Sequence, residues 1–158
     1  MSRGLGDVYK RQTIDRGSDD GIALYDPVMT SNGLIGMVCE IAPNYAKVAT
    51  ILSDEINVGV MTFDSKVTGI LDNDIKNANE GNCLMSYITK DSGIKEGEIV
   101  KSVAGVVFPG NLLIGTVSKV YDDENGLSVH AVIKPAVDVR TVTDCVVITD
   151  FKGQGVVD

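Results

Sequence analysis

The sequence predicts an all-β protein built from two small related units. Short runs rich in Val and Ile, bounded by Gly, Asn, Asp and Pro, are typical of strands. No long apolar stripe with helical spacing interrupts them. The stretch Leu-Ile-Gly-x-Val occurs at 34–38 and again at 113–117, which indicates an internal repeat. Paired all-β units of this kind favour two related barrels, or one pseudo-symmetric barrel.

Ten strands are predicted in order, at residues 27–30, 34–41, 47–52, 56–63, 66–71, 83–89, 98–103, 112–120, 127–133 and 139–149. Alternation within 127–133 places Leu127, Val129, Ala131 and Ile133 on one face and His130 on the other. The polar, Asn-rich residues 72–82 predict a mobile loop between the two halves.

A turn motif extends the repeat upstream of the glycine strand. Asp-x-Gly-x-x-acid-Gly occurs at 15–21 and at 91–97, an offset of 76 residues, whereas Gly36 and Gly115 are 79 residues apart. A longer second loop, "VAGVVFPGN", accounts for the larger offset. The Asp-x-Gly part of each motif predicts a turn with glycine at positive φ. Gly36 and Gly115 lie inside strands, which indicates a bulge, a bend or a close backbone approach.

Composition excludes several classes of function. The net charge of −8 and a pI near 4.5 oppose binding to nucleic acid or to anionic lipid. Cys39, Cys83 and Cys145 cannot all pair and show no zinc-site spacing, so neither a metal nor a cofactor is predicted. The sequence contains no Trp, which disfavours one candidate function, that of a small peptidoglycan-binding β-module.

The chain divides into three segments. Residues 1–12 are interpreted as a non-native or disordered leader, 13–150 as the β-domain and 151–158 as a C-terminal tail. Neither a signal peptide nor a run of about 18 apolar residues is present in the sequence.

Catalytic residue types are sparse. His130 is the one histidine, and no nucleophile motif of a serine or cysteine protease accompanies it. Asp15 and Asp91 lie in polar turn sequence, unlike the buried carboxylates of an aspartic-protease dyad. We therefore expect no enzyme; a cryptic or degenerate chymotrypsin-like double-barrel protease is the alternative.

Several stretches together resemble the extracytoplasmic β-domain of the bacterial rod-shape-determining family MreC. They include "TIDRGSDDGI", "PVMTSNGLIGMVCEIAPNYAKVATILSD", "IKEGEIVKS" and "VVFPGNLLIGTVSKVYDDENGLSVHAVIKPAVDVRTVTDCVVI". In order, they cover most of residues 13–149. The resemblance implies two small six-stranded β-barrels, arranged like those of a chymotrypsin-type protease but without its catalytic residues.

The resemblance also implies a non-catalytic scaffold of the cell-elongation complex, on the outer face of the cytoplasmic membrane. Its implied partners are class B penicillin-binding transpeptidases, MreD-like and other membrane proteins of that complex, and further copies of itself. Self-association would use the β-domain and a coiled coil, and neither that coiled coil nor the family's membrane anchor occurs in this sequence.

Two sets of residues follow from this reading. Exposed apolar residues should cluster where a scaffold makes contact, and the longer second loop supplies the candidates Val106, Val107, Phe108 and Pro109. The alternative interpretation is that Phe108 plugs a barrel end. A structural signature comprises Gly33, Gly36, Gly110, Gly115 and Pro135, the last ending a strand because it cannot donate a ladder hydrogen bond.

Overall fold

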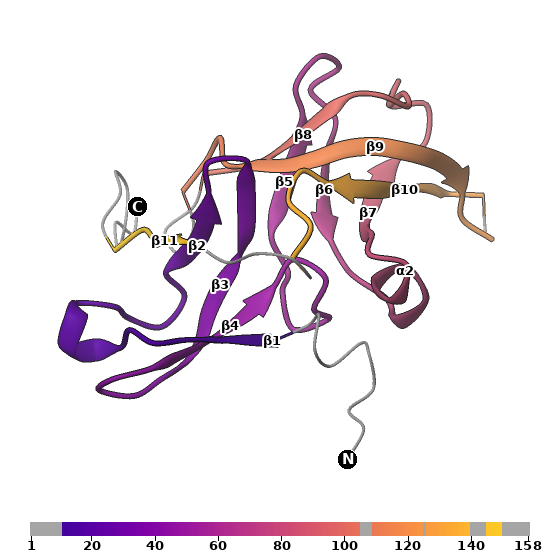
Figure 1. Cartoon of the computed structure of the whole chain (residues 1–158). Coiled ribbons are helices and arrows are strands. Elements are labelled where there is room, and N and C mark those ends of the chain that lie inside the picture. Colours follow the sequence, from indigo (N-terminus) through magenta and orange to yellow (C-terminus); the bar gives the residue numbers. More distant parts are fainter. Residues whose placement is uncertain (1–10, 105–108, 125, 140–144, 150–158) are drawn as a thin grey trace.

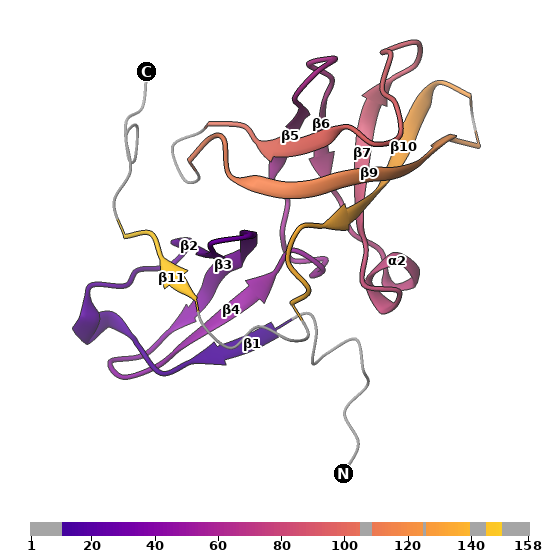
Figure 2. The same cartoon turned by 45° about the horizontal axis from the view of Figure 1, so that its top comes forward.

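Two β-units pack side by side in the computed structural model, which describes residues 11–104, 109–124, 126–139 and 145–149. One unit is a five-stranded sheet and the other a closed six-stranded barrel (Figures 1 and 2). No helix in these ranges is long and apolar enough to cross a membrane.

The first unit has the strand order β1-β4-β3-β2-β11, all antiparallel. Its strands are β1 (Arg11–Ile14), β2 (Pro27–Thr30), β3 (Gly33–Ile41), β4 (Ala46–Thr50) and β11 (Val146–Val147). A single 3-10 turn, η1 (Ser18–Asp20), lies between β1 and β2.

The second unit closes in the order β10-β7-β6-β5-β8-β9. Its strands are β5 (Gly59–Thr62), β6 (Thr68–Leu71), β7 (Cys83–Thr89), β8 (Ile99–Ser102), β9 (Leu113–Asp122) and β10 (Ser128–Pro135). On β10, Val129, Ala131 and Ile133 point inward as predicted, whereas Leu127 precedes the strand and is 77% exposed.

The all-β class and one six-stranded barrel are confirmed. Strands β1, β4, β3, β2 and β11 of the first unit match β7, β10, β9, β8 and β5 of the second, each in the same neighbour order. Over the described residues, the first unit has no counterpart of β6. It is therefore an open sheet there, and a second closed barrel is not observed.

Backbone hydrogen bonds show which residues of the two copies of the repeat are equivalent. Tyr25 N–H donates to Val38 C=O at 2.8 Å, and Gly97 N–H donates to Val117 C=O at 2.7 Å. Tyr25 therefore corresponds to Gly97 at an offset of 72 residues, not the predicted 76. The sequence match failed because Tyr25, with φ of 72°, stands where the second unit has a glycine.

The shifted register also corrects one predicted turn. Gly93 has φ of 89°, as predicted, but Gly17 has φ of −141° and is extended. A Cβ at Gly17 would lie 2.0 Å from Ala42 O, so this glycine permits a close backbone approach rather than a left-handed turn.

The glycines of the repeated strands occupy equivalent places. A Cβ on Gly36 would lie 2.0 Å from Ala49 O, and one on Gly115 would lie 2.1 Å from Lys134 O. Beside each glycine the strand pairing contains a β-bulge, in which Ile35 or Ile114 is the extra residue. The bulge turns both isoleucines into the core, where they are 2% and 0% exposed.

The predicted mobile loop at 72–82 is wrong in part, because it contains the helix α2 (Ile75–Asn79). Asp74 caps this helix: its Oδ1 accepts a hydrogen bond from Asn77 N–H at 2.8 Å. Just before it, buried Asn73 donates to Ile51 O at 2.5 Å and Ser53 O at 3.0 Å, and its Oδ1 accepts from Leu84 N–H. The segment thus ties β7 to the end of β4.

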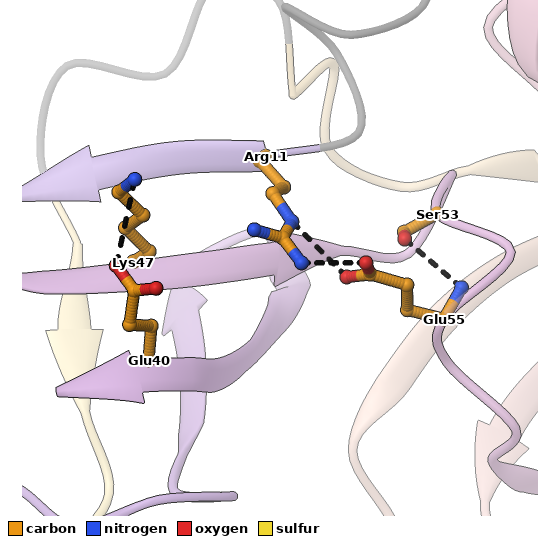
Figure 3. Close-up of polar contacts among 5 residues, drawn as sticks. All are labelled: Arg11, Glu40, Lys47, Ser53 and Glu55. Atoms are coloured by element: carbon orange, nitrogen blue, oxygen red, sulfur yellow. Dashed lines mark hydrogen bonds and ion pairs between the residues drawn. The ribbon is translucent and has the colours of Figure 1, made fainter.

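Strand β1 begins two residues inside the segment interpreted as a leader. Gln12 pairs with Val48 of β4, and Arg11 forms a hydrogen-bonded ion pair with Glu55 beyond β4 at 2.5 Å (Figure 3). A neighbouring pair, Lys47 with Glu40 at 3.4 Å, links β4 to β3. All four side chains are 41–49% exposed, so each pair contributes at most about 1 kcal/mol.

Candidate interaction surface

Exposed apolar side chains gather on the outer face of the barrel, over β5, β6 and β8. Alternate residues of β5 and β8 point inward, and Val60, Thr62 and Val100 are 0% exposed. Their neighbours point outward. We call the outward set the Phe63 face: Met61, Phe63, Ile70, Ile99 and Val103.

Strand register arranges the Phe63 face in rows. Phe63 N–H donates to Ile99 C=O at 2.8 Å, which puts these two half-exposed side chains at one end. At the other end, Gly59 pairs with Ile70 and accepts a hydrogen bond from Val103 N–H at 2.9 Å. Because Gly59 has no side chain, the surface is lower between Ile70 and Val103. A Cβ there would come no closer than 3.8 Å to its described neighbours.

Two lysine ammonium groups lie over the Phe63 ring. Lys66 Nζ is 5.1 Å from the ring centroid, and Lys101 Nζ is 4.5 Å from it. Neither lysine forms an ion pair with an acid in the described part of the chain. The face is thus apolar and positively charged at its Phe63 end, on a chain whose net charge is −8.

A buried carboxylate fixes the β5–β6 turn that carries Lys66. Glu98, 6% exposed, accepts hydrogen bonds from Ser65 N–H at 2.8 Å, Ser65 Oγ at 3.0 Å and Lys95 N–H at 2.8 Å. Burial alone would raise the pKa of Glu98. The hydrogen bonds to its charged form outweigh this effect and hold the pKa below its usual value.

The same turn is tied to its own strands. Thr62 Oγ1 lies 2.8 Å from Ser65 Oγ and accepts from Val67 N–H at 2.9 Å. These contacts hold Lys66 at φ of 60°, a conformation uncommon for residues other than glycine. The backbone of the turn between Phe63 and Lys66 is therefore held by contacts within the domain itself.

The contact residues predicted from sequence belong to the segment that follows Val103 in the chain. Val106, Val107 and Phe108 are outside the described residues. Pro109 is half-buried, and its C=O accepts a hydrogen bond from Ser102 Oγ at 2.8 Å. The chain enters this loop directly after Val103 of the Phe63 face.

The signature residues lie elsewhere. Gly33, at φ of 157°, approaches the second unit, where its Cβ would lie 3.0 Å from Leu113 O. Gly110 packs on Ala104, and Pro135 ends β10 opposite Gly115. All of these contacts are with backbone or neighbouring strands, and none is with the Phe63 face.

Sequence reasoning missed the Phe63 face, although a signal existed. The predicted strands 56–63 and 66–71 leave only a short turn between them, which is typical of a hairpin. Alternation along 59–63 would have placed Met61 and Phe63 on one face. The cation–π contacts could not be predicted, because they need the register of β5 against β8.

One cluster combines serine, histidine and aspartate. His130 Nδ1 lies 3.1 Å from Ser86 Oγ, and its Nε2 lies 3.4 Å from Asp123 Oδ1. Tyr121 packs on the imidazole with ring centroids 5.5 Å apart. A bulge in β7 brings them together, since His130 faces both Ser86 and Tyr87. His130 therefore has partners that the sequence did not reveal.

The burial of this cluster is opposite to that of a hydrolytic triad. A triad needs an accessible nucleophile and a buried acid. Ser86 is 4% exposed, whereas the Asp123 side chain is 31% exposed. Hydrogen bonds from Glu124 N–H and from the Ser128 hydroxyl hold the pKa of Asp123 below its usual value. The arrangement fits a hydrogen-bonded strand contact, not a site for attack on a substrate.

Two hollows remain. One of about 730 Å³ lies between β1 and β11 and is lined partly by Arg16, Asp20 and Cys145. The other, about 550 Å³, lies beside α2 and is lined partly by Asp74, Lys119 and Tyr121. Across the described ranges no group of three or more His, Cys, Asp or Glu side chains is placed to hold a metal ion.

The described residues form an all-β domain with two repeat-related units and an exposed apolar face, which is typical of an interaction domain. Residues 1–149 match the family model "Rod shape-determining protein MreC, barrel core". The chain belongs to the MreC family.

Individual relatives agree. The cell shape-determining protein MreC of Listeria monocytogenes serovar 1/2a (strain ATCC BAA-679 / EGD-e) is 31% identical over 152 residues, which are 92% of this chain. The chain spans about half (50%) of that relative. A solved L. monocytogenes MreC structure matches with a TM-score of 0.81 and 29% identity, covering 93% of this chain and 71% of that one.

A more distant structure shares the fold. It is a complex between penicillin-binding protein PBP2 and MreC from Helicobacter pylori, with a TM-score of 0.56 and 18% identity. The match covers 68% of this chain and 65% of that one.

Proposed function

We propose that this chain is the extracytoplasmic β-domain of a scaffold in the bacterial cell-elongation complex, needed for rod shape, and that it binds a class B penicillin-binding transpeptidase. Membership of the MreC family supports the role. The H. pylori complex of PBP2 with MreC supports the partner. The observation that carries the proposal is the exposed Phe63 face, because an apolar surface of this kind marks a contact site.

The scaffold acts without catalysis. Burial of Ser86 beside His130 supports this, since a substrate cannot reach its Oγ. An active-site-directed fluorophosphonate provides the test. The folded chain should not be labelled, whereas stoichiometric labelling at Ser86 would favour the protease alternative.

The domain works outside the cytoplasmic membrane and associates with further copies of itself and with MreD-like membrane proteins. One solved MreC structure is described as the major periplasmic domain of a cell shape-determining filament, which supports the location and the self-association. Val106, Val107, Phe108 and Pro109, which follow Val103 in the sequence, are proposed as further partner contacts.

Binding to the extracytoplasmic part of the transpeptidase from the same organism tests the proposal. Biolayer interferometry with the 158-residue chain should give saturable binding, and sedimentation of the mixture should give a defined complex. If neither method detects a complex, the experiment is repeated with a leucine-zipper fusion that supplies the avidity of a coiled coil. Failure of both forms would contradict the proposed partner.

A further inference from the structure

We propose that the Phe63 face docks a partner segment that carries carboxylate side chains next to apolar ones. The inference rests on the proposed function in one respect, since we expect the transpeptidase to supply that segment. It goes further in naming the surface on this chain and the chemistry that fits it.

The two lysine ammonium groups determine which kind of partner fits the Phe63 face. Lys66 and Lys101 hold their ammonium groups over Phe63 without a described acidic partner, although the chain has 22 acidic and 14 basic residues. A purely apolar partner would remove water from both ammonium groups and leave them uncompensated, which is unfavourable. A carboxylate above the ring would replace that water with charge-assisted hydrogen bonds.

The shape of the Phe63 face determines where the apolar side chain of the partner lies. Gly59 has no side chain between Ile70 and Val103, and the lysines lie at the Phe63 end. Gly59 and Phe63 are four residues apart along the strand, about 13 Å. A partner strand should therefore carry its carboxylate and a large apolar side chain four residues apart, so that both point to the same face.

The surface is pre-organised for this contact. The two hydrogen bonds from Ser65 to Glu98 hold the turn that carries Lys66, and a third, from Lys95 N–H, holds the Glu98 carboxylate in place. Little conformational entropy of the turn is then lost on binding, which favours affinity.

Two variants remove the two recognition features separately. Lys66→Glu/Lys101→Glu reverses the charge at one exposed and one half-buried side chain. Gly59→Gln fills the low point, and its Cβ meets no described atom closer than 3.8 Å, so the strand can accept it. We expect each to weaken binding of the transpeptidase part by about tenfold or more. Wild-type binding should also weaken as salt is raised.

Matched controls carry the same chemistry elsewhere. Lys76→Glu/Lys119→Glu makes the same charge change at exposed lysines that line the hollow beside α2. Ser118→Gln adds the same side chain at an exposed position of β9. Both controls should bind within twofold of wild type, and all four variants should keep the melting temperature within a few degrees.

The outcomes separate the two proposals. If wild type binds and both face variants bind within twofold of it, the docking surface is wrong although the proposed function stands. If wild type does not bind, the proposed partner fails. The face is then judged with two synthetic strand peptides that carry either two Glu or two Lys among Leu and Tyr.

Nuclear magnetic resonance spectra report the peptide contacts residue by residue. Saturable shifts around 59–70 and 99–103 with the Glu peptide, and not with the Lys peptide, would support the docking surface. No shifts at millimolar peptide, or equal shifts with both peptides, would overturn it.

Discussion

Two buried acids at equivalent positions of the repeat show how local hydrogen bonds set a charge. Asp26 precedes β2 and accepts one hydrogen bond, from Ala23 N–H at 2.9 Å. Glu98 precedes β8 and accepts three. Burial is the larger effect at Asp26 and raises its pKa, whereas the hydrogen bonds prevail at Glu98 and lower its pKa.

The two acids should therefore affect stability with opposite signs. Glu98 stabilises the fold above its unfolded pKa of about 4.5, and this stabilisation is lost as pH falls through the lower folded pKa. Glu98→Gln should lower the free energy of unfolding at pH 7 by about 2 kcal/mol. Urea unfolding at a series of pH values should show the difference shrinking below pH 4.5.

Asp26→Asn provides the opposite test. The ionised carboxylate of Asp26 opposes folding once pH exceeds its raised folded pKa. The variant should be more stable than wild type at pH 7, and the two should converge as pH falls toward 3.8. The same sign of change at Asp26 and Glu98 would refute this account of the two sites.

The repeated glycines are expected to resist substitution. Gly36→Ala and Gly115→Ala would each bring a Cβ to about 2 Å from a carbonyl oxygen, so the strands must separate. We expect a loss of about 1–3 kcal/mol in the free energy of unfolding from chemical denaturation. Gly59→Ala is the control, with room for the methyl group, and should change stability by less than about 0.5 kcal/mol. Equal losses at all three positions would show that strand propensity, not close approach, is responsible.

At the scale of elements, most strands were predicted, but β1 was missed and the strand predicted at 139–149 is seen only as β11 in the described residues. Strands β2 and β7 have the predicted bounds, since Val and Ile runs end there at turn residues. Helix α2 was missed because its five residues are too few to show helical periodicity. Its capping residue Asp74 was the available signal.

Asn73 links the two units, so its removal should destabilise the whole domain. Asn73→Ala would leave Ile51 O, Ser53 O and Leu84 N–H without this partner in a buried setting. We expect the free energy of unfolding to fall by about 2–4 kcal/mol, measured by thermal and chemical unfolding. Asn32→Ala, at an exposed turn, should fall within about 0.5 kcal/mol of wild type. Similar losses in the two variants would mean that Asn73 does not tie β7 to β4.

At the scale of the whole molecule, one copy of the repeat lies in the five-stranded sheet and the other lies in the barrel. The sequence alone left this division open. Both units contribute to a single hydrophobic core cluster. The sequence could predict two related β-units because apolar alternation and the glycine strands are local patterns. It could not place the docking surface, because the Phe63 face joins residues from three strands through their register.

The Phe63 face is the proposed contact of this domain with a transpeptidase. Photo-crosslinking in rod-shaped cells tests it most directly, with a photoreactive amino acid placed at Ile99 or, as a control, at Ile75 of the full-length protein. Both side chains are exposed, but Ile75 lies on α2, outside the face. We predict a crosslink to the transpeptidase from position 99 and none from position 75. Crosslinking from position 75 alone, or from neither position, would contradict the claim.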